Sequence, residues 1–306
     1  MYTYLSTMIS SWQKELSVVL LVLTTILWGT SFIITKTLTQ TLPIFLYLTL
    51  RFSIAIIGFF PYFLHFKHID KKSAFGGFLT GLIFFISIVF QTAGIQTTSA
   101  GKAAFITALG TIMVPFIAWI GFKKKINIRI WIALPFCFIG TSLLLLEGES
   151  GIVIGDFLVL ACAFSYAVFI IFNDKYVHLV DVYVFSVFQL ITISLFSFIM
   201  SLIIKETFNF ATVSYPFWLV IVYMSIAVTA CTFLFQNWSQ QHQGPSETAI
   251  IFTLEPVFAV LFASFILSNE TMTLFGWIGC VLIFIALLIA VLKKNKEKSS
   301  KSDNKI

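Results

Sequence analysis

The composition of this 306-residue chain indicates the solvent in which it folds. Hydrophobic residues make up 59% of the chain, aromatic residues 17% and charged residues only 10%, and there are 36 phenylalanines. Soluble domains carry about 25% charged residues, so this chain has too little polar surface to cover a globule in water. The composition excludes a soluble enzyme, a nucleic-acid-binding protein and a disordered protein, and it predicts a protein of the lipid bilayer.

Sustained apolar runs predict an all-α polytopic membrane protein with ten transmembrane helices, since a span needs about 20 apolar residues. The runs contain almost no alternation of polar and apolar residues, which excludes an outer-membrane barrel. The segment Met1–Lys14 lacks the basic start of a cleaved signal peptide, so the first run is expected to stay in the protein. The predicted spans are 16–36, 43–65, 74–95, 100–122, 128–146, 155–174, 180–204, 215–238, 246–267 and 273–292.

The net charge of +6 reflects lysines that gather in the predicted loops and at the tail, so it does not indicate nucleic acid. With the N-terminus inside, fifteen Lys and Arg residues fall on the inner side, whereas only Lys36, Lys102 and Lys205 fall outside. This bias places both termini in the cytoplasm and the chain in the cytoplasmic (inner) membrane. Residues 1–15 are then a cytoplasmic N-terminus, and the Lys/Ser-rich residues 293–306 a disordered basic cytoplasmic tail.

The two halves of the chain repeat each other at offsets between 137 and 146 residues. The repeat predicts two units, 16–146 and 155–292, and five spans per unit require that the second unit be inverted. Inverted repeats are typical of secondary transporters, which bind substrate near mid-membrane where the repeats meet. The matched pairs are Leu21–Leu23 with Leu158–Leu160, Arg51 with Gln189, Phe90-Gln91 with Phe235-Gln236, Ala108 with Ala249, Pro115 with Pro256, and Trp131-Ile132 with Trp277-Ile278.

Several short motifs resemble the drug/metabolite transporter superfamily, and specifically its EamA family, over about residues 16–292. They are Trp28-Gly29-Thr30-Ser31-Phe32, the run from Thr97 to Thr107 that leads to Val114-Pro115, Gly155-Asp156-Phe157-Leu158, Leu254-Glu255-Pro256-Val257-Phe258-Ala259, Asn269-Glu270 and Gly276-Trp277. The resemblance implies ten helices in two inverted EamA repeats and the transport of small metabolites by alternating access. It says almost nothing about the substrate.

Two ionisable residues lie deep in the predicted spans. Arg51 is about 12 Å from the outer end of its helix, where an unpaired charge is costly. It is either a clamp for a substrate carboxylate or a structural arginine held by carbonyls or an acidic partner. Glu255, directly before Pro256, is either a carboxylate that couples a proton or binds an ammonium group, or a structural group at a proline kink.

Further residues are candidates for substrate binding, each with a structural alternative. Lys102 either attracts an anionic substrate or extends to the membrane interface. The repeat-related Gln91 and Gln236 either face the cavity as a pair or join helices by hydrogen bonds. Further candidates are Trp28, Tyr166, Asn173, Asn237 and Trp238. The aromatic faces among them suit cation–π contacts, or else these rings belong to the core or face lipid.

Pro115 and Pro256 each remove a backbone donor near the middle of a predicted helix, so they are expected to act as hinges or as static kinks. Small residues, including Gly77 and Gly81, indicate a close approach of helices. The four cysteines lie in apolar runs without metal-ligand spacing, and no phosphate loop or catalytic set is present, so neither a cofactor, a metal nor an enzymatic activity is expected.

The sequence therefore predicts a secondary transporter of small polar metabolites, with amino acids or their derivatives as the expected substrates and export as the favoured direction. Its partners would be the substrate, the lipid bilayer and a coupled proton. Import of a zwitterionic metabolite such as S-adenosylmethionine is the alternative within the same class. A non-transporting membrane scaffold or a membrane-embedded enzyme is the alternative from another class.

Overall fold

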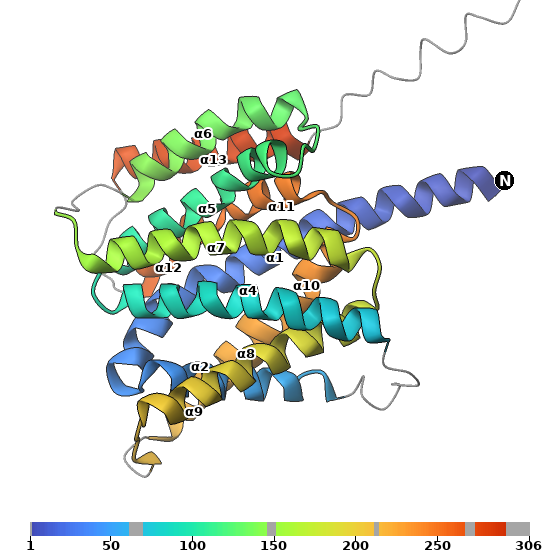
Figure 1. Ribbon diagram of the computed structural model, residues 1–306. Coiled ribbons are helices and arrows are strands. Elements are labelled where there is room, and N and C mark those ends of the chain that lie inside the picture. Colours follow the sequence, from blue (N-terminus) through green and yellow to red (C-terminus); the bar gives the residue numbers. More distant parts are fainter. Residues whose placement is uncertain (1, 61–69, 146–150, 211–213, 267–272, 292–306) are drawn as a thin grey trace, which may run out of the picture.

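The computed structural model describes residues 2–60, 70–145, 151–210, 214–266 and 273–291, and every regular element in those ranges is helical (Figure 1). The predicted tail 293–306 lies outside them. The helices are α1 (Tyr2–Thr41), α2 (Ile44–Ile57), α4 (Lys71–Ile95), α5 (Ala100–Ile120), α6 (Ile128–Leu145), α7 (Ile154–Val177), α8 (Val182–Ile204), α9 (Tyr215–Ser225), the π-helix η2 (Ile226–Cys231), α10 (Thr232–Gln240), α11 (Pro245–Phe252), α12 (Glu255–Ile266) and α13 (Leu274–Val291).

These helices fit an apolar solvent in length and composition. Seven helical stretches within the described residues are long and apolar enough to cross a membrane. Three shorter apolar helices, α2, α6 and α13, accompany them. Hydrocarbon offers no hydrogen bonds to the backbone, so a chain of this composition satisfies its N–H and C=O groups within helices. The protein is therefore an all-helical, multi-pass membrane protein.

Side-chain contacts at the helix ends define two opposite faces of the bundle. At one, which we call the α7-start face, Lys102 Nζ pairs with Asp156 Oδ2 at 2.6 Å, and this joins the beginnings of α5 and α7. At the other, the α7-end face, Lys124 Nζ pairs with Asp174 Oδ2 at 2.6 Å. Gln241, just after α10, donates a 2.8 Å hydrogen bond to the Val177 carbonyl at this same face.

Packing of the helices follows the two halves of the chain (Figure 1). α6 packs along α13 at one edge, and α2 packs along α8. Equivalent helices of the two halves make equivalent contacts. The contact of α4 with α7 corresponds to that of α10 with α1, and the contact of α4 with α8 corresponds to that of α9 with α2. The contact of α5 with α7 corresponds to that of α12 with α1. The glycines predicted at close approaches lie at such contacts, since a Cβ atom on Gly77 would be 2.6 Å from the Phe185 carbonyl oxygen of α8.

The observed helices differ from the predicted spans at four places. The predicted span 43–65 is interrupted, because α2 ends at Ile57 and Gly58 and Phe59 form a turn. α1 starts at Tyr2, and its first part projects past the other helices (Figure 1). The predicted span 215–238 is divided by the π-helical turn of η2. The predicted span 246–267 corresponds to the apolar stretch Pro245–Phe262, but a two-residue break divides it into α11 and α12. The prediction that Pro256 lies near the middle of a helix is therefore wrong, because it is the second residue of α12. Pro256 has no N–H to bond the Phe252 carbonyl, which favours the break at this position. Pro115, in contrast, lies inside the unbroken α5.

Candidate functional site

A cavity of about 50 Å³ lies in the middle of the bundle. Its lining includes Gln91 near the end of α4 and Thr107 in the first half of α5, which are on the α7-start side. Tyr166, one of its lining residues, is near the midpoint of α7. Six helices contribute to the cavity, which places it where the two halves of the chain meet. Its lining residues are Trp28, Ser31, Arg51, Phe84, Ser87, Ile88, Gln91, Thr107, Cys162, Tyr166 and Glu255.

Arg51 is held in the cavity wall by hydroxyl groups. It is the eighth residue of α2, and its side chain is only 6% exposed. Its Nε donates a 2.7 Å hydrogen bond to Thr229 Oγ1, and one Nη donates a 3.3 Å bond to the Tyr47 hydroxyl. A guanidinium has five N–H donors, so after these two bonds it keeps donors for a ligand in the cavity.

The π-helix η2 supplies the acceptor for Arg51. Thr229 Oγ1 donates its own proton to the Met224 carbonyl five residues earlier, at 2.7 Å, and therefore accepts from the arginine. Trp28 is held in the same way, because its Nε1 donates a 3.1 Å bond to Thr232 Oγ1, which donates to the Val228 carbonyl. π-Helical turns occur often at functional sites, and here the turn positions Arg51, whereas Trp28 is held by the first residue of α10.

Glu255 enters the cavity at the break between α11 and α12. It is the first residue of α12 and only 9% exposed. The positive end of a helix dipole stabilises a carboxylate at this position. Glu255 and Arg51 line the same cavity but form no ion pair with each other, nor does Glu255 form one with any other described residue.

The structure brings most of the predicted site residues together. Arg51, Glu255, Trp28, Tyr166 and Gln91 all line the cavity. Gln91 Nε2 also lies 3.4 Å from Thr107 Oγ1, a second lining side chain.

Three predicted binding residues lie elsewhere. Lys102 is occupied by its ion pair with Asp156 and by a bond to the Gly151 carbonyl at the α7-start face. Trp238 lies against the ring of His242, with a centroid distance of 4.3 Å, near the α7-end face. Gln236, the repeat partner of Gln91, is 1% exposed and does not line the cavity.

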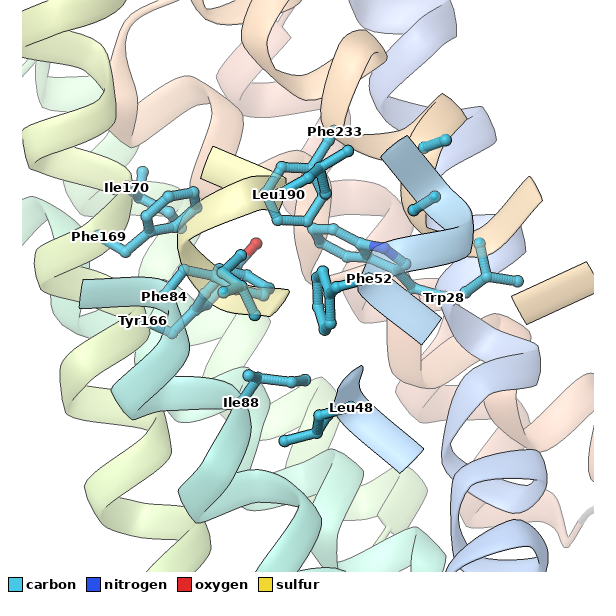
Figure 2. Packing of buried hydrophobic residues seen from close by; sticks show 14 of the residues in the cluster. Trp28, Leu48, Phe52, Phe84, Ile88, Tyr166, Phe169, Ile170, Leu190 and Phe233 are labelled. Carbon is cyan, nitrogen blue, oxygen red and sulfur yellow. The ribbon is translucent and has the colours of Figure 1, made fainter. Parts of the chain in front are cut away.

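A layer of aromatic rings, whose members Phe84 and Tyr166 also line the cavity, packs in the middle of the bundle (Figure 2). Its members Phe169 and Phe233 lie further toward the α7-end face along α7 and α10. Phe84 is its centre, with ring-centroid distances of 4.9 Å to both Phe169 and Phe233. Phe52 and Tyr166 extend the layer at centroid distances of 6.3 and 6.2 Å from Phe84. Edge-to-face contacts of this kind are dry and stabilising, so they close the middle of the bundle on this side.

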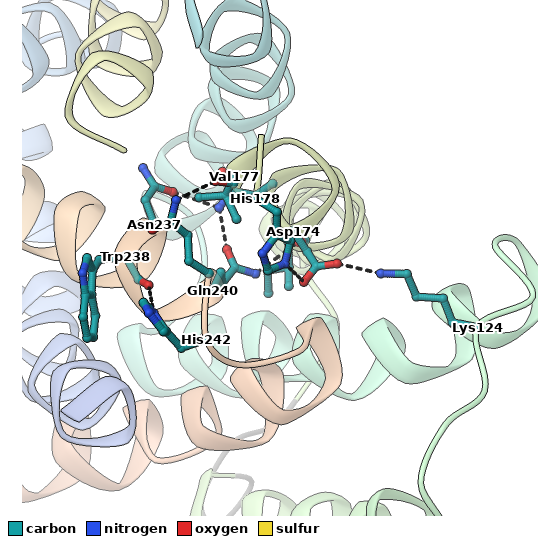
Figure 3. Close-up of polar contacts among 11 residues, drawn as sticks. Lys124, Asp174, Val177, His178, Asn237, Trp238, Gln240 and His242 are labelled. Carbon is teal, nitrogen blue, oxygen red and sulfur yellow. Dashed lines mark hydrogen bonds and ion pairs between the residues drawn. The ribbon is translucent and has the colours of Figure 1, made fainter. Parts of the chain in front are cut away.

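Beyond the aromatic layer, a buried amide network joins α4, α7, α8 and α10. Asn237 Nδ2 donates 2.7 Å bonds to Ser186 Oγ and Gln189 Oε1, and Asn173 Nδ2 donates to Asn237 Oδ1 at 2.8 Å. Gln189 Nε2 donates in turn to Asn173 Oδ1 at 2.7 Å and to Thr80 Oγ1 at 2.8 Å. Figure 3 shows the α10 part of this network next to the ion pair of Lys124 with Asp174. The α7-end side is therefore closed by two successive layers.

The comparisons with known proteins agree with this architecture. Residues 15–146 and 153–292 match the EamA-like transporter family. This chain belongs to that family. An uncharacterized transporter from Archaeoglobus fulgidus is 31% identical over 276 residues, which cover 89% of this chain and 85% of the relative. A protein of known crystal structure has the same fold, with a TM-score of 0.73 at 19% identity over 90% of this chain and 96% of the other.

Several features of this EamA-like transporter were not predicted from its sequence. Of the amide network, Asn173 and Asn237 are candidates from the sequence, but their bonds to each other and to Gln189 were not predicted. The hydroxyl groups of Thr229 and Thr232 carry no individual signal in an apolar run. The sequence signal for the network is a high content of Asn and Gln in residues 236–243 and the repeat match of Arg51 with Gln189. The π-turn has no sequence signature that propensity could reveal.

The described residues of the transporter offer no group of three or more His, Cys, Asp or Glu side chains that could hold a metal ion. Cys137, Cys162 and Cys280 are buried free thiols, and Cys231 is half-buried. The cavity is thus lined by one guanidinium, one carboxylate, one amide, hydroxyl groups, the Cys162 thiol, one aliphatic side chain and aromatic rings, which can bind a polar solute through hydrogen bonds and ionic contacts.

Proposed function

We propose that this membrane transporter moves a small zwitterionic metabolite, an amino acid or a derivative of one, and that the central cavity binds it. The observation that carries the proposal is the presence of Arg51 and Glu255 in one cavity without an ion pair between them. Arg51 would bind the carboxylate of the solute in its planar fork, and Glu255 would bind the ammonium group.

The lining residues around these two charges fit the same class of solute. Trp28 and Tyr166 present aromatic rings to an apolar or cationic side chain. Gln91 and Thr107 present an amide and a hydroxyl to uncharged polar groups. A basic and an acidic side chain in one cavity favour a zwitterion over a simple anion or cation, because an anion alone would leave Glu255 without a partner and a cation alone would leave Arg51 without one.

The transport cycle that we propose is alternating access between two inverted repeats of five spans, residues 16–146 and 155–292. The corresponding helix contacts in the two halves support this arrangement. A cavity of about 50 Å³ is far below the 300–1,000 Å³ of a typical ligand site, so the bundle must open to admit the solute. The excess of Lys and Arg on the α7-end side supports a cytoplasmic location for that face in the inner membrane.

Transport assays in proteoliposomes test this proposal. The purified chain is assayed for uptake and efflux with a panel of amino acids, amino-acid derivatives and S-adenosylmethionine, each with and without a pH gradient. We expect movement of a zwitterion, with export as the direction at physiological gradients. A panel in which no solute moves faster than in protein-free liposomes would contradict the proposal.

Substitutions of the two charges locate the site. Arg51→Gln removes charge-assisted hydrogen bonds that are worth about 1.5–3 kcal/mol, so the apparent KM for the solute should rise about 10- to 150-fold. Glu255→Gln should reduce the preference of the transporter for solutes that carry an ammonium group. It should also reduce any increase in transport rate that a pH gradient produces. Lys124→Gln is the matched control, since it makes the same basic-to-amide change in an ion pair that is 41% exposed on the lysine side, away from the cavity. Equal effects of Arg51→Gln and Lys124→Gln would refute the clamp.

A further inference from the structure

Buried polar atoms without partners are concentrated on the closed side of the bundle. Seven side-chain N or O atoms in the described part of the chain are buried without a hydrogen-bond partner, and four of them belong to α10 and α11. These four are Gln236 Nε2, Ser239 Oγ, Ser246 Oγ and Thr248 Oγ1. The helices α10 and α11 pack against each other and against α7 near the α7-end face.

Such atoms are unfavourable in a static structure. A buried donor or acceptor without a partner loses its bonds to water and gains nothing in return. Gln236 is 1% exposed and Thr248 is 0% exposed. The Gln236 amide lies near the Tyr166 hydroxyl of the cavity wall, but neither Nε2 nor the hydroxyl reaches hydrogen-bond geometry with a described residue. Groups of this kind gain partners when another conformation brings a ligand or water to them.

Two of the unpartnered side chains, Gln236 and Thr248, have repeat equivalents in the first half of the chain. Gln236 matches Gln91 through the pair Phe235-Gln236 and Phe90-Gln91, and each glutamine lies four residues before the end of its helix. Thr248 matches Thr107, since each directly precedes a matched alanine. Gln91 and Thr107 line the cavity and are in contact with each other. Their two partners in the second half are the groups that are buried and unsatisfied.

We propose that Gln236 and Thr248 form a second half-site for the transported solute, equivalent to Gln91 and Thr107 and closed in this conformation. This inference rests on the proposed function. When the bundle opens at the α7-end face, the second half-site binds the same uncharged hydrogen-bonding groups of the solute that Gln91 and Thr107 bind on the other side. Arg51 and Glu255 lie at the level between the two half-sites and serve both.

The contacts of Arg51 and Glu255 link the central charges to the helices that carry Gln236 and Thr248. Arg51 is bonded to Thr229 in η2, three residues before α10. Glu255 directly follows α11 across the helix break. The two charges are therefore connected to the helices that carry the second half-site. By helix register, Gln236 and Thr248 lie at the level of the amide network, on the α7-end side of the aromatic layer. Opening must part these layers, and it then exposes Gln236 and Thr248.

Thiol labelling tests the inference without knowledge of the solute. Cys137, Cys162, Cys231 and Cys280 are replaced by serine, and Thr107→Cys, Thr248→Cys or Gln236→Cys is introduced as a single reporter. A membrane-impermeant maleimide is then applied to either side of oriented membrane vesicles. We expect labelling of Thr107→Cys from the α7-start side and of Thr248→Cys and Gln236→Cys from the α7-end side. A state populated about 1–10% of the time would label roughly 10- to 100-fold more slowly than an open one.

Thr141→Cys is the matched control. Thr141 is also a fully buried threonine with an unpartnered hydroxyl, but it lies in α6, away from both half-sites. Its thiol should stay unlabelled from either side. Asn237→Ala, which loosens the amide network, should raise the labelling rate of Thr248→Cys about threefold or more and lower that of Thr107→Cys.

The outcomes separate this inference from the proposed function. If Thr107→Cys is labelled while both second-half reporters behave like Thr141→Cys, the second half-site is refuted and the central site stands. Labelling of all three reporters from the same side also refutes it. If no reporter is labelled from either side, both the inference and alternating access through this cavity are refuted.

Discussion

Replacing Thr229 by valine removes the hydroxyl that holds Arg51 and leaves the shape of the side chain nearly unchanged. The threonine accepts the 2.7 Å hydrogen bond from Arg51 Nε and donates its own proton to the Met224 carbonyl. Thr229→Val therefore leaves the guanidinium with the longer, 3.3 Å bond to Tyr47 as its remaining bond among the described side chains. We expect Arg51 to lose its fixed orientation in the cavity and the solute to bind more weakly.

The size of the effect follows from the one bond that is lost between helices. Hydrogen bonds between membrane helices average about 0.6 kcal/mol and reach about 1.7 kcal/mol. These values correspond to roughly 3- to 18-fold in an equilibrium constant. If the whole free energy of the lost hydrogen bond is lost from solute binding by Arg51, the apparent KM should rise by that factor, with a smaller change in maximal rate. The KM is measured for the zwitterion that the transport panel identifies.

The assay combines transport with thermal unfolding in detergent. Thr229→Ser keeps the hydroxyl and should retain an apparent KM near that of the natural chain, whereas Thr229→Val should not. A general loss of stability would lower the unfolding midpoint and the amount of active protein without changing the KM. The positioning of Arg51 by the π-helix would be refuted if Thr229→Val had the same apparent KM as the unsubstituted protein. It would also be refuted if Thr229→Val and Thr229→Ser changed the apparent KM equally.

Three further predictions concern stability, each measured by thermal unfolding in detergent. Gly77→Ala should destabilise the protein by about 1–3 kcal/mol, because its Cβ would meet the backbone of α8. Gly101→Ala is the control, since its Cβ would have no atom within 4 Å, and it should be neutral or stabilising by up to about 1 kcal/mol. Equal changes in stability for Gly77→Ala and Gly101→Ala would contradict the close approach of α4 to α8. Asn237→Ala removes three bonds between helices and should cost about 2 kcal/mol, whereas Ser197→Ala, which removes an unpartnered hydroxyl, should cost little. At the start of α4, the backbone N–H of Lys72 lowers the pKa of the Asp70 carboxyl. This carboxylate therefore adds stability above its unfolded-state pKa and loses it as the pH falls through its lower folded-state pKa, so the acid dependence should weaken in Asp70→Asn.

The membrane character of this protein could be predicted from its composition, and its two deep ionisable residues from their positions in the sequence. An arginine and a glutamate inside long apolar runs are rare and expensive, so Arg51 and Glu255 are visible in the sequence as exceptions to a simple rule. The structure places both in one cavity. Lys102 is also a basic residue in an apolar run, but its role depends on Asp156, which is 54 residues away in the sequence and adjacent only after folding.

The sequence by itself determined the solvent, the helical class, the family resemblance and the two halves, because hydropathy and repeated motifs are properties of composition and order. Only the tertiary structure decided which polar groups meet. Gln91 and Gln236 occupy equivalent positions in the repeat, yet one faces the cavity and the other is buried without a partner. The reason is physical: a repeat in sequence fixes equivalent positions, but the side chains that pack around each position differ between the two halves. The aromatic layer and the amide network are such a difference, because their residues meet only in the folded chain.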